Sequence, residues 1–356
     1  MSYSGTVGQT VITVQKLIDH GARRAGKLAE ELTVEQVQAS KESLFYILSN
    51  LINQGIQYFA IKKTVIGLNP DQYQYSLPVG GNDVLNALYR TLNRPTPNIA
   101  NGYSASSGNA DLAFDDNTAT ADTQTAPNGY IAVNYGTNNS IYAGSIGILP
   151  ATSGSFHILL EWSNDGSTWN TLYDTGVTTW VSGQWHWYDI DPGVTAQYYR
   201  MRETGGGTLS VAEFFVGNNS TEITMSRLNR DDYTNLPNKN FTANQPFQFW
   251  LNRTIPQATI TVWPTPSDPF VQMTVWYSAY VEDVGALSGQ LAIPDRWLMA
   301  IQNMLGHQMA QELPGVDLAR IQYLEGQAQK YFQMAEQEER DKSPIMLSPN
   351  ISVYSR

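Results

Sequence analysis

The feature that most constrains the fold is an internal segment, residues 95–219, whose composition differs from that of the chain around it. It carries 11 acidic residues and only two basic ones, Arg200 and Arg202, and it has no Lys. The remaining residues carry 21 acidic and 19 basic side chains. Because the two parts differ so much in charge, we expect two domains of different origin. Neither part has the basic surface of a tight nucleic-acid binder.

The overall composition excludes several classes of protein. With 42% hydrophobic residues, 15% charged residues and 20 Tyr, the chain is too apolar and aromatic to be mostly disordered. Its apolar runs are far shorter than the roughly 20 residues of a transmembrane helix. The absence of Cys excludes disulfides, thiolate metal sites and Cys nucleophiles. Since the N-terminus carries no secretory signal, we expect the protein to be made and folded in the cytoplasm.

The sequence of the internal segment indicates an all-β fold. Short aromatic and β-branched runs alternate with clusters of Gly, Asn, Asp and Ser, as in sandwiches and jelly rolls. Asn164-Asp165-Gly166 is a hairpin signal between two such runs. We expect Gly205-Gly206-Gly207 to form a second turn rather than a phosphate-binding loop, because no helix start with Lys-Ser or Lys-Thr follows it.

Four pieces of this segment resemble, in order, the discoidin-like jelly roll, also called the galactose-binding-like or coagulation-factor type C domain. The most specific piece is Glu161-Trp-Ser-Asn-Asp-Gly-Ser-Thr-Trp-Asn-Thr-Leu172. The other pieces are residues 113–120, 130–136, and 199–202 together with 211–214. The resemblance covers residues 98–219. It implies a sugar-binding or protein-binding module of a kind often inserted into other proteins.

The same resemblance implies a structural Ca²⁺ in the first piece, helped by a Glu late in the domain. By position the ligands are Asp115, Asn117, Thr120 and Glu213. Carboxylate, amide and carbonyl oxygens are the ligands that Ca²⁺ prefers. The sequence departs from the pattern at Asp116, where Gly is usual, and at Ala121, where an aromatic residue is usual. A metal site and a metal-free turn capped by Asp and Asn both stay open, and no cofactor is expected to be required.

An aromatic cluster in residues 178–191 is the candidate ligand-binding or partner-binding surface. Its members are Trp180, Trp185, His186, Trp187 and Tyr188. Exposed aromatic rings beside polar groups suit sugars, and Trp and Tyr also anchor protein interfaces. Alternate residues of a strand face the same side, so Trp185 and Trp187 are equally consistent with a core. Core, protein interface and sugar platform therefore all stay open.

The outer parts of the chain indicate helices and a small β-sheet. Apolar residues at helical spacing predict two helices in the first 60 residues, and Thr33 with Gln36 forms a capping-box signal before the second. Residues 58–66 and 73–77 are expected to form a β-hairpin, and residues 84–92 a short helix. Further strands follow residue 220, and two helices begin near Pro294 and Val316. The fold class is therefore α+β, a helical core with a small sheet plus an inserted all-β jelly-roll sandwich.

The order of landmarks in these outer parts resembles the head-to-tail adaptor, connector or tail accessory proteins of short-tailed bacteriophages. The resemblance depends on several short stretches and on no single diagnostic motif. They are Tyr75-Ser76-Leu77-Pro78, Ser226-Arg227, Asp232-Tyr233, Lys239, residues 246–250, residues 260–264, Glu282-Asp283 and residues 293–297. The division that follows is 1–94 and 220–342 for the adaptor core, 95–219 for the inserted jelly roll, and 343–356 for an extended tail.

The adaptor resemblance implies a structural virion protein at the head–tail junction. It implies a ring of about twelve copies, a dodecamer, that joins the portal protein to the tail nozzle and carries a tail fibre or tailspike. Duplex DNA would pass through a lumen too poor in positive charge to hold its phosphates. The tail, with Ile351, Val353, Tyr354 and Arg356, would bind the portal. The insert would face outward, for fibre attachment or contact with host glycans.

No catalytic residues are predicted. None of the four His residues has another His three to five positions away, and no Gly-x-Ser-x-Gly motif is present. The carboxylates of the internal segment could form a glycosidase pair only in the sense that any acidic domain could. We therefore expect no enzyme. The alternative to the adaptor is a carbohydrate-binding, lectin-like protein carried on a helical stalk.

Overall fold

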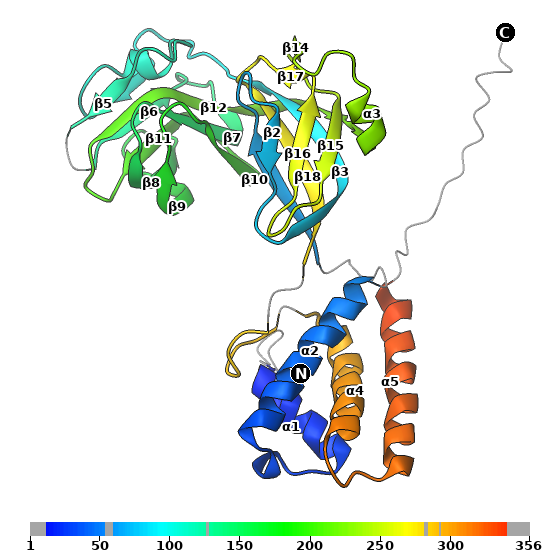
Figure 1. Cartoon of the computed structure of the whole chain (residues 1–356). Helices are drawn as coiled ribbons and strands as arrows, with labels where there is room; N and C mark the ends of the chain where they lie inside the picture. The colour runs from blue at the N-terminus through cyan, green and yellow to red at the C-terminus, as the bar shows by residue number, and fades with distance from the viewer. Residues whose placement is uncertain (1–11, 54–59, 126–127, 281–283, 292, 340–356) are drawn as a thin grey trace, which may run out of the picture. The chain divides into compact units, whose positions relative to one another are not determined.

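A computed structural model of the chain describes residues 12–53, 60–125, 128–280, 284–291 and 293–339 (Figure 1). The chain divides into two compact units. Met1–Ile61 and Ala279–Arg356 form the helical unit, and Lys62–Ser278 form the β unit. Across the ranges that the structure describes, no helix is both long enough and apolar enough to cross a membrane. The segment predicted to form an extended tail, with Ile351, Val353, Tyr354 and Arg356, lies outside the described residues.

The described part of the helical unit is a bundle of four α-helices packed around one apolar core (Figure 1). The helices are α1 (Val14–Ala25), α2 (Val34–Asn53), α4 (Asp295–Glu312) and α5 (Leu318–Glu339), with a short 3₁₀ turn η1 (Ala29–Glu31) after α1. The predicted capping box at the start of α2 is confirmed. The Gln36 amide donates to Thr33 Oγ1 at 3.3 Å, and the Thr33 amide donates to Gln36 Oε1 at 3.0 Å.

Helices α1 and α4 approach closely at two glycines, Gly21 of α1 and Gly306 of α4. A Cβ on Gly21 would lie 2.7 Å from Met309 Sδ, so only Gly fits against α4 without a shift of that side chain. One turn further along α1, Arg24 Nη1 donates to Oδ1 of the buried Asn303 at 2.7 Å. The contact therefore combines close backbone packing with one specific polar pair.

In its described residues the β unit contains strands, one short α-helix, α3 (Arg230–Thr234), and a 3₁₀ turn, η3 (Ala110–Ala113). The strands are β1 (Ile61–Gly67), β2 (Gln74–Ser76), β3 (Gly81–Asn93), β4 (Tyr103–Ala105), β5 (Asp122–Gln124), β6 (Tyr130–Asn134), β7 (Ile141–Pro150), β8 (Gly154–Ser163), β9 (Asn170–Trp180), β10 (His186–Ala196), β11 (Tyr198–Glu203), β12 (Leu209–Thr224), β13 (Ser226–Leu228), β14 (Thr242–Ala243), β15 (Gln248–Asn252), β16 (Thr259–Trp263), β17 (Thr265–Pro266) and β18 (Val271–Ala279).

The middle of the chain forms the predicted all-β sandwich. One layer has the order β4-β6-β11-β8-β9, and the other contains β5, β12, β7 and β10. Neighbouring strands within both layers pair antiparallel. Apolar side chains of both layers fill the space between them, including Phe214, Ile148, Leu160, Tyr199 and Met201. The turns predicted at 164–166 and 205–207 do connect β8 to β9 and β11 to β12.

Strand β12 joins this sandwich to the rest of the β unit. Its first part pairs with β7, and its last part, from Asn218 to Thr224, pairs with β3. One layer of the sandwich therefore continues through β12 into β3, β18 and β1. The remaining strands form a sheet of order β13-β15-β16-β2 and the pair β14-β17. The division at residues 95 and 219 stays a prediction.

Two local predictions are wrong. Residues 84–92 belong to strand β3 and not to a helix, because β3 is paired on both sides, by β18 and β12. Good helix formers in this stretch are overridden by tertiary pairing. The expected hairpin of residues 58–66 and 73–77 does not form either. Strand β1 lies beside β18, and β2 pairs with β16 in another sheet.

Candidate functional site

The aromatic cluster predicted for ligand binding faces the interior. Trp180 is fully buried, stacks on His186 at a centroid distance of 5.3 Å, and contacts Phe156 from β8. Tyr188 packs against the sandwich core and against Tyr173 of β9. Burial raises the pKa of Tyr188 to about 12 and lowers that of His186. These three side chains therefore pack in the interior, as in the core alternative that the sequence left open.

Trp185 and Trp187 lie on the other face of β10 and fill the junction between the sandwich and the flanking strands. The two indoles stack at 4.7 Å, and Trp185 contacts the ring of Phe270. A Cβ on Gly67 of β1 would lie 1.8 Å from the Trp187 ring, and one on Gly147 of β7 would lie 2.3 Å from it. Trp187 is thus held between a flanking strand and a sandwich strand.

A charged cluster ties the same two parts together. The guanidinium of Arg90, buried on β3, lies 2.6 Å from Asp189 of β10 and 2.5 Å from Glu222 of β12. Lys63 of β1 lies 3.1 Å from Asp189. Burial alone would raise the pKa of Asp189, but the hydrogen bonds and charges of Arg90 and Lys63 outweigh it and lower the pKa.

Three of the residues predicted to bind Ca²⁺ are engaged with one another. Asp115, Asn117 and Thr120 hydrogen-bond within their own turn. The Asn117 amide donates to Asp115 Oδ1 at 3.0 Å, and Thr120 Oγ1 donates to Asp115 Oδ2 at 2.8 Å. No group of three or more His, Cys, Asp or Glu residues suited to a metal ion occurs among the described residues. The turn has the form of the capped, metal-free alternative.

The fourth predicted ligand, Glu213, is fully buried and paired with an arginine. Arg94 Nη1 lies 2.9 Å from Glu213 Oε2, and the same guanidinium binds the Asp116 carboxylate. Glu213 Oε1 is buried without a hydrogen-bond partner among the described groups. Burial raises the pKa of Glu213, and Arg94 offsets part of that effect. A divalent ion would have to share Glu213 with a guanidinium of like charge, so these residues do not fit Ca²⁺.

The glycine turn at 205–207 is an anion cradle already filled by the chain itself. The buried Glu203 carboxylate accepts from the amides of Gly205, Gly206 and Gly207 at 2.7, 2.7 and 3.1 Å. These three amides are therefore occupied and are not free to bind a phosphate. This agrees with the prediction of a turn.

The β unit has a cleft of about 520 Å³ beside the 115–120 turn. It lies where the sandwich meets the flanking strands. Its described lining holds no charged side chain and combines hydroxyl, amide and apolar groups. The lining includes Asn69, Pro70, Thr118, Thr120, Leu149, Ala151, Ser182, Gly183, Trp185, Ala212 and Pro269. A cleft of this size suits a small ligand, and its lack of charge suits a neutral one.

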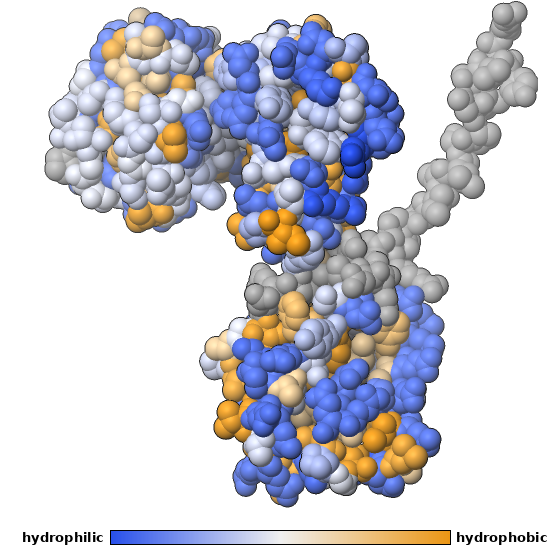
Figure 2. All heavy atoms as spheres, viewed as in Figure 1, coloured by the Kyte–Doolittle hydropathy of each residue, from blue (hydrophilic) through white to orange (hydrophobic). Residues whose placement is uncertain are grey.

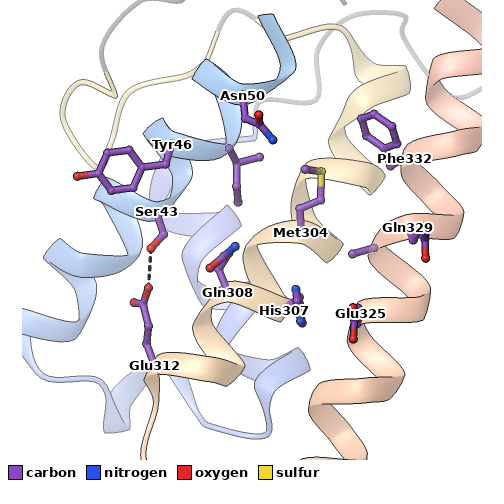
Figure 3. Close-up of a pocket in the computed structure, with 12 residues that line it drawn as sticks. Ser43, Tyr46, Asn50, Met304, His307, Gln308, Glu312, Glu325, Gln329 and Phe332 are labelled. Atoms are coloured by element: carbon purple, nitrogen blue, oxygen red, sulfur yellow. Dashed lines mark hydrogen bonds between the residues drawn. The ribbon is translucent and has the colours of Figure 1, made fainter. Parts of the chain in front are cut away.

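A second pocket, of about 620 Å³, lies between α2, α4 and α5 of the helical unit (Figure 3). Ser43 Oγ donates to Glu312 Oε1 at 3.0 Å along one side. Met304, His307 and Phe332 line the remainder with other side chains of the three helices.

Apolar side chains are exposed over the helical unit (Figure 2). Val34 at the start of α2 is 88% exposed, and large exposed residues also occur on α4 and α5. The set is Val34, Tyr46, Met299, Leu318, Tyr323 and Met334. Where such side chains form one contiguous patch, they mark a surface that binds other proteins.

Sequence reasoning missed the two arginines that organise the β unit, Arg90 and Arg94. Arg90 was placed in an expected helix and Arg94 at the predicted boundary of the insert, and neither pattern indicates an ion pair with a residue far away in sequence. The only available signal was the shortage of cations between residues 95 and 219. Eleven acidic groups with only two arginines among them leave an excess of negative charge. This excess indicates that cations from outside the segment pair with some of these carboxylates.

Comparison with known proteins gives structural similarities alone. The chain matches no protein-family model and no curated protein. Similar solved structures include chitosan-binding module 1 of a chitosanase/glucanase from Paenibacillus sp. IK-5, at 22% identity and a TM-score of 0.28, over 35% of this chain and 96% of that one. The family 32 carbohydrate-binding module of C. perfringens NanJ, in complex with galactose, matches at 22% identity and a TM-score of 0.28. That match covers 33% of this chain and 92% of the module. A pectin-binding carbohydrate-binding module matches at 15% identity and a TM-score of 0.30, over 37% of this chain and 95% of that one.

Proposed function

We propose that this protein is a glycan-binding protein whose β unit holds a neutral sugar in the uncharged cleft. The observation that carries the proposal is the cleft itself, about 520 Å³ and lined without charge inside an acidic domain. Sugars present hydroxyl groups and apolar C–H faces. Thr118 and Ser182 offer hydroxyl groups, and Leu149, Ala151 and Trp185 offer apolar surface.

The surrounding charge selects against anionic ligands. The segment 95–219 carries nine more negative than positive side chains. Its two cations, Arg200 and Arg202, both bind the Glu161 carboxylate, at 2.6 and 2.8 Å. Acidic sugars and nucleic acids would therefore meet repulsion without a matching cation in the cleft. A neutral oligosaccharide is the ligand class that this arrangement favours.

A glycan array with the labelled full-length chain tests the proposal. We expect binding to a set of neutral oligosaccharides, weakly dependent on salt because no ion pair is formed. Binding confined to sulfated or uronic-acid glycans, or binding to no glycan at all, would contradict it.

A second candidate function is the ring-shaped adaptor at a phage head–tail junction. The observation that favours it is the set of exposed apolar side chains on α2, α4 and α5. Copies that pack these helices against one another would remove that surface from water and close a ring. Native mass spectrometry tests this directly. A single closed oligomer of about twelve copies supports the adaptor, and a monomer at micromolar concentration argues against it.

A further inference from the structure

Arg94 lies just after β3 and reaches into the acidic turn of the sandwich. Its guanidinium donates to three oxygens: Glu213 Oε2 at 2.9 Å, the Phe114 carbonyl at 3.3 Å, and the carboxylate of Asp116. The guanidinium carbon also lies 5.4 Å from the centroid of the Phe270 ring. With only 14% of its side chain exposed, Arg94 is a mostly buried cation with a full set of partners.

The oxygens around Arg94 are of the kind that would otherwise attract a hard metal ion. Two carboxylates and one backbone carbonyl surround a single positive group. Glu213 is 0% exposed, so its charge cannot be balanced by water. A planar guanidinium suits this task because its fixed N–H groups can serve several oxygens at once.

The backbone of the turn is shaped for this contact. Asp116 has φ of +57°, in the left-handed region that non-glycine residues seldom adopt. Its carboxylate meets Arg94 from this conformation. The neighbouring Asp115, Asn117 and Thr120 satisfy one another instead. The predicted ligand set is therefore split into a self-capped turn and an arginine-bound pair.

We propose that Arg94 is a built-in cation that takes the place of a divalent ion at the acidic turn of the sandwich. The turn is thereby held from the flanking strand β3, and the fold needs no Ca²⁺. A segment cut at residue 95 would lack this cation and would leave Glu213 buried without its partner.

Thermal unfolding of the full chain tests the proposal. The wild type should melt within about 1 °C of the same temperature in millimolar Ca²⁺ and in chelator, because no site is open to the ion. Arg94→Met should lower the Tm of the β unit by roughly 6–20 °C, since it strands a buried carboxylate. Arg253→Met is the matched control. Arg253 is exposed and also pairs with one carboxylate, so its loss should shift the Tm by no more than about 2 °C.

A second variant separates the ion pair from general packing. Glu213→Gln removes the buried charge. Adding Arg94→Met to that variant should therefore lower the Tm by less than Arg94→Met does in the wild type. If Arg94→Met does not fold, Arg94→Lys replaces it, with a smaller loss expected because the charge remains. Two results would overturn the proposal: a wild-type Tm several degrees higher in Ca²⁺, with the rise absent in Glu213→Gln, or an Arg94→Met variant as stable as Arg253→Met.

Discussion

At the scale of single residues, the contact between Gly67 and the Trp187 ring makes the sharpest prediction. Gly67→Ala places a methyl group where the ring now lies, since its Cβ would be 1.8 Å from that ring. We expect a loss of about 1–3 kcal/mol in the stability of the β unit, from overpacking. Chemical denaturation measures it. Gly326→Ala in α5 is the control, because no atom lies within 4 Å of its Cβ and helix propensity should stabilise by up to about 1 kcal/mol. A neutral Gly67→Ala would show that the junction is loosely packed.

Residue-level prediction from sequence succeeded where the signal was local. The capping box at Thr33 and Gln36 depends on atoms three residues apart, and the turn at Asn164-Asp165-Gly166 depends on adjacent residues. The roles of Arg94 and Trp187 depend on distant partners, since Glu213 lies 119 positions from Arg94 and Gly67 lies 120 positions from Trp187. No local pattern carries that information. The sequence left open which way the aromatic side chains of β10 point relative to the core, because that direction depends on the strand register.

At the scale of single elements, the first turn of α2 depends on its capping box. Thr33→Ala removes the hydroxyl that accepts from the Gln36 amide. We expect a loss of about 1 kcal/mol in the stability of the helical unit, as for other N-cap substitutions. Thr33→Ser keeps the hydroxyl and should cost much less. Equal stability of all three proteins in urea would show that the cap contributes nothing.

The stability of the β unit should depend on pH through the ion pair between Asp189 of β10 and Arg90 of β3. Arg90 and Lys63 lower the pKa of Asp189 in the folded state, so its ionised form stabilises the fold above its unfolded pKa near 3.8. That contribution is lost as pH falls below about 4. Asp189→Asn should cost about 3–5 kcal/mol at pH 7, and the difference from wild type should shrink by pH 3.

The control for this prediction uses the other carboxylate near Lys63. Asp191 lies 3.9 Å from the Lys63 amine and is 80% exposed, so Asp191→Asn should change stability by less than about 0.5 kcal/mol. Urea unfolding at the two pH values measures both variants. A pH-independent gap between Asp189→Asn and wild type would exclude the ionised carboxylate as the stabilising form.

Strand β3 shows why element type was harder to predict than element position. The starts of α4 and α5 lie close to those expected, because amphipathic spacing and a Pro residue mark them. Residues 84–92 have good helix-forming side chains, and only pairing with β12 and β18 makes them a strand. Such pairing joins residues from opposite sides of the internal segment, which a local pattern does not reveal.

At the scale of the whole molecule, the β unit should unfold as one cooperative body. Strand β12 is shared by the sandwich and the flanking sheet, and Trp187, Arg90 and Arg94 cross between them. Hydrogen exchange under denaturant should give peptides from β7 and β18 the same opening free energy within about 1 kcal/mol. An independent opening of β7 at much lower denaturant would instead favour a separately folding insert.

The central claim, that the uncharged cleft binds a neutral glycan, is tested most directly by isothermal titration of a cleft-blocking variant. Thr118 lines the cleft and is exposed, so Thr118→Tyr fills space without disturbing the core. Thr137→Tyr makes the same change at an exposed position outside the lining. With the tightest neutral oligosaccharide from the array, Thr118→Tyr should weaken binding at least about tenfold, or about 1.4 kcal/mol, while Thr137→Tyr should match the wild type. Equal affinity for all three proteins would place the sugar elsewhere and contradict the claim.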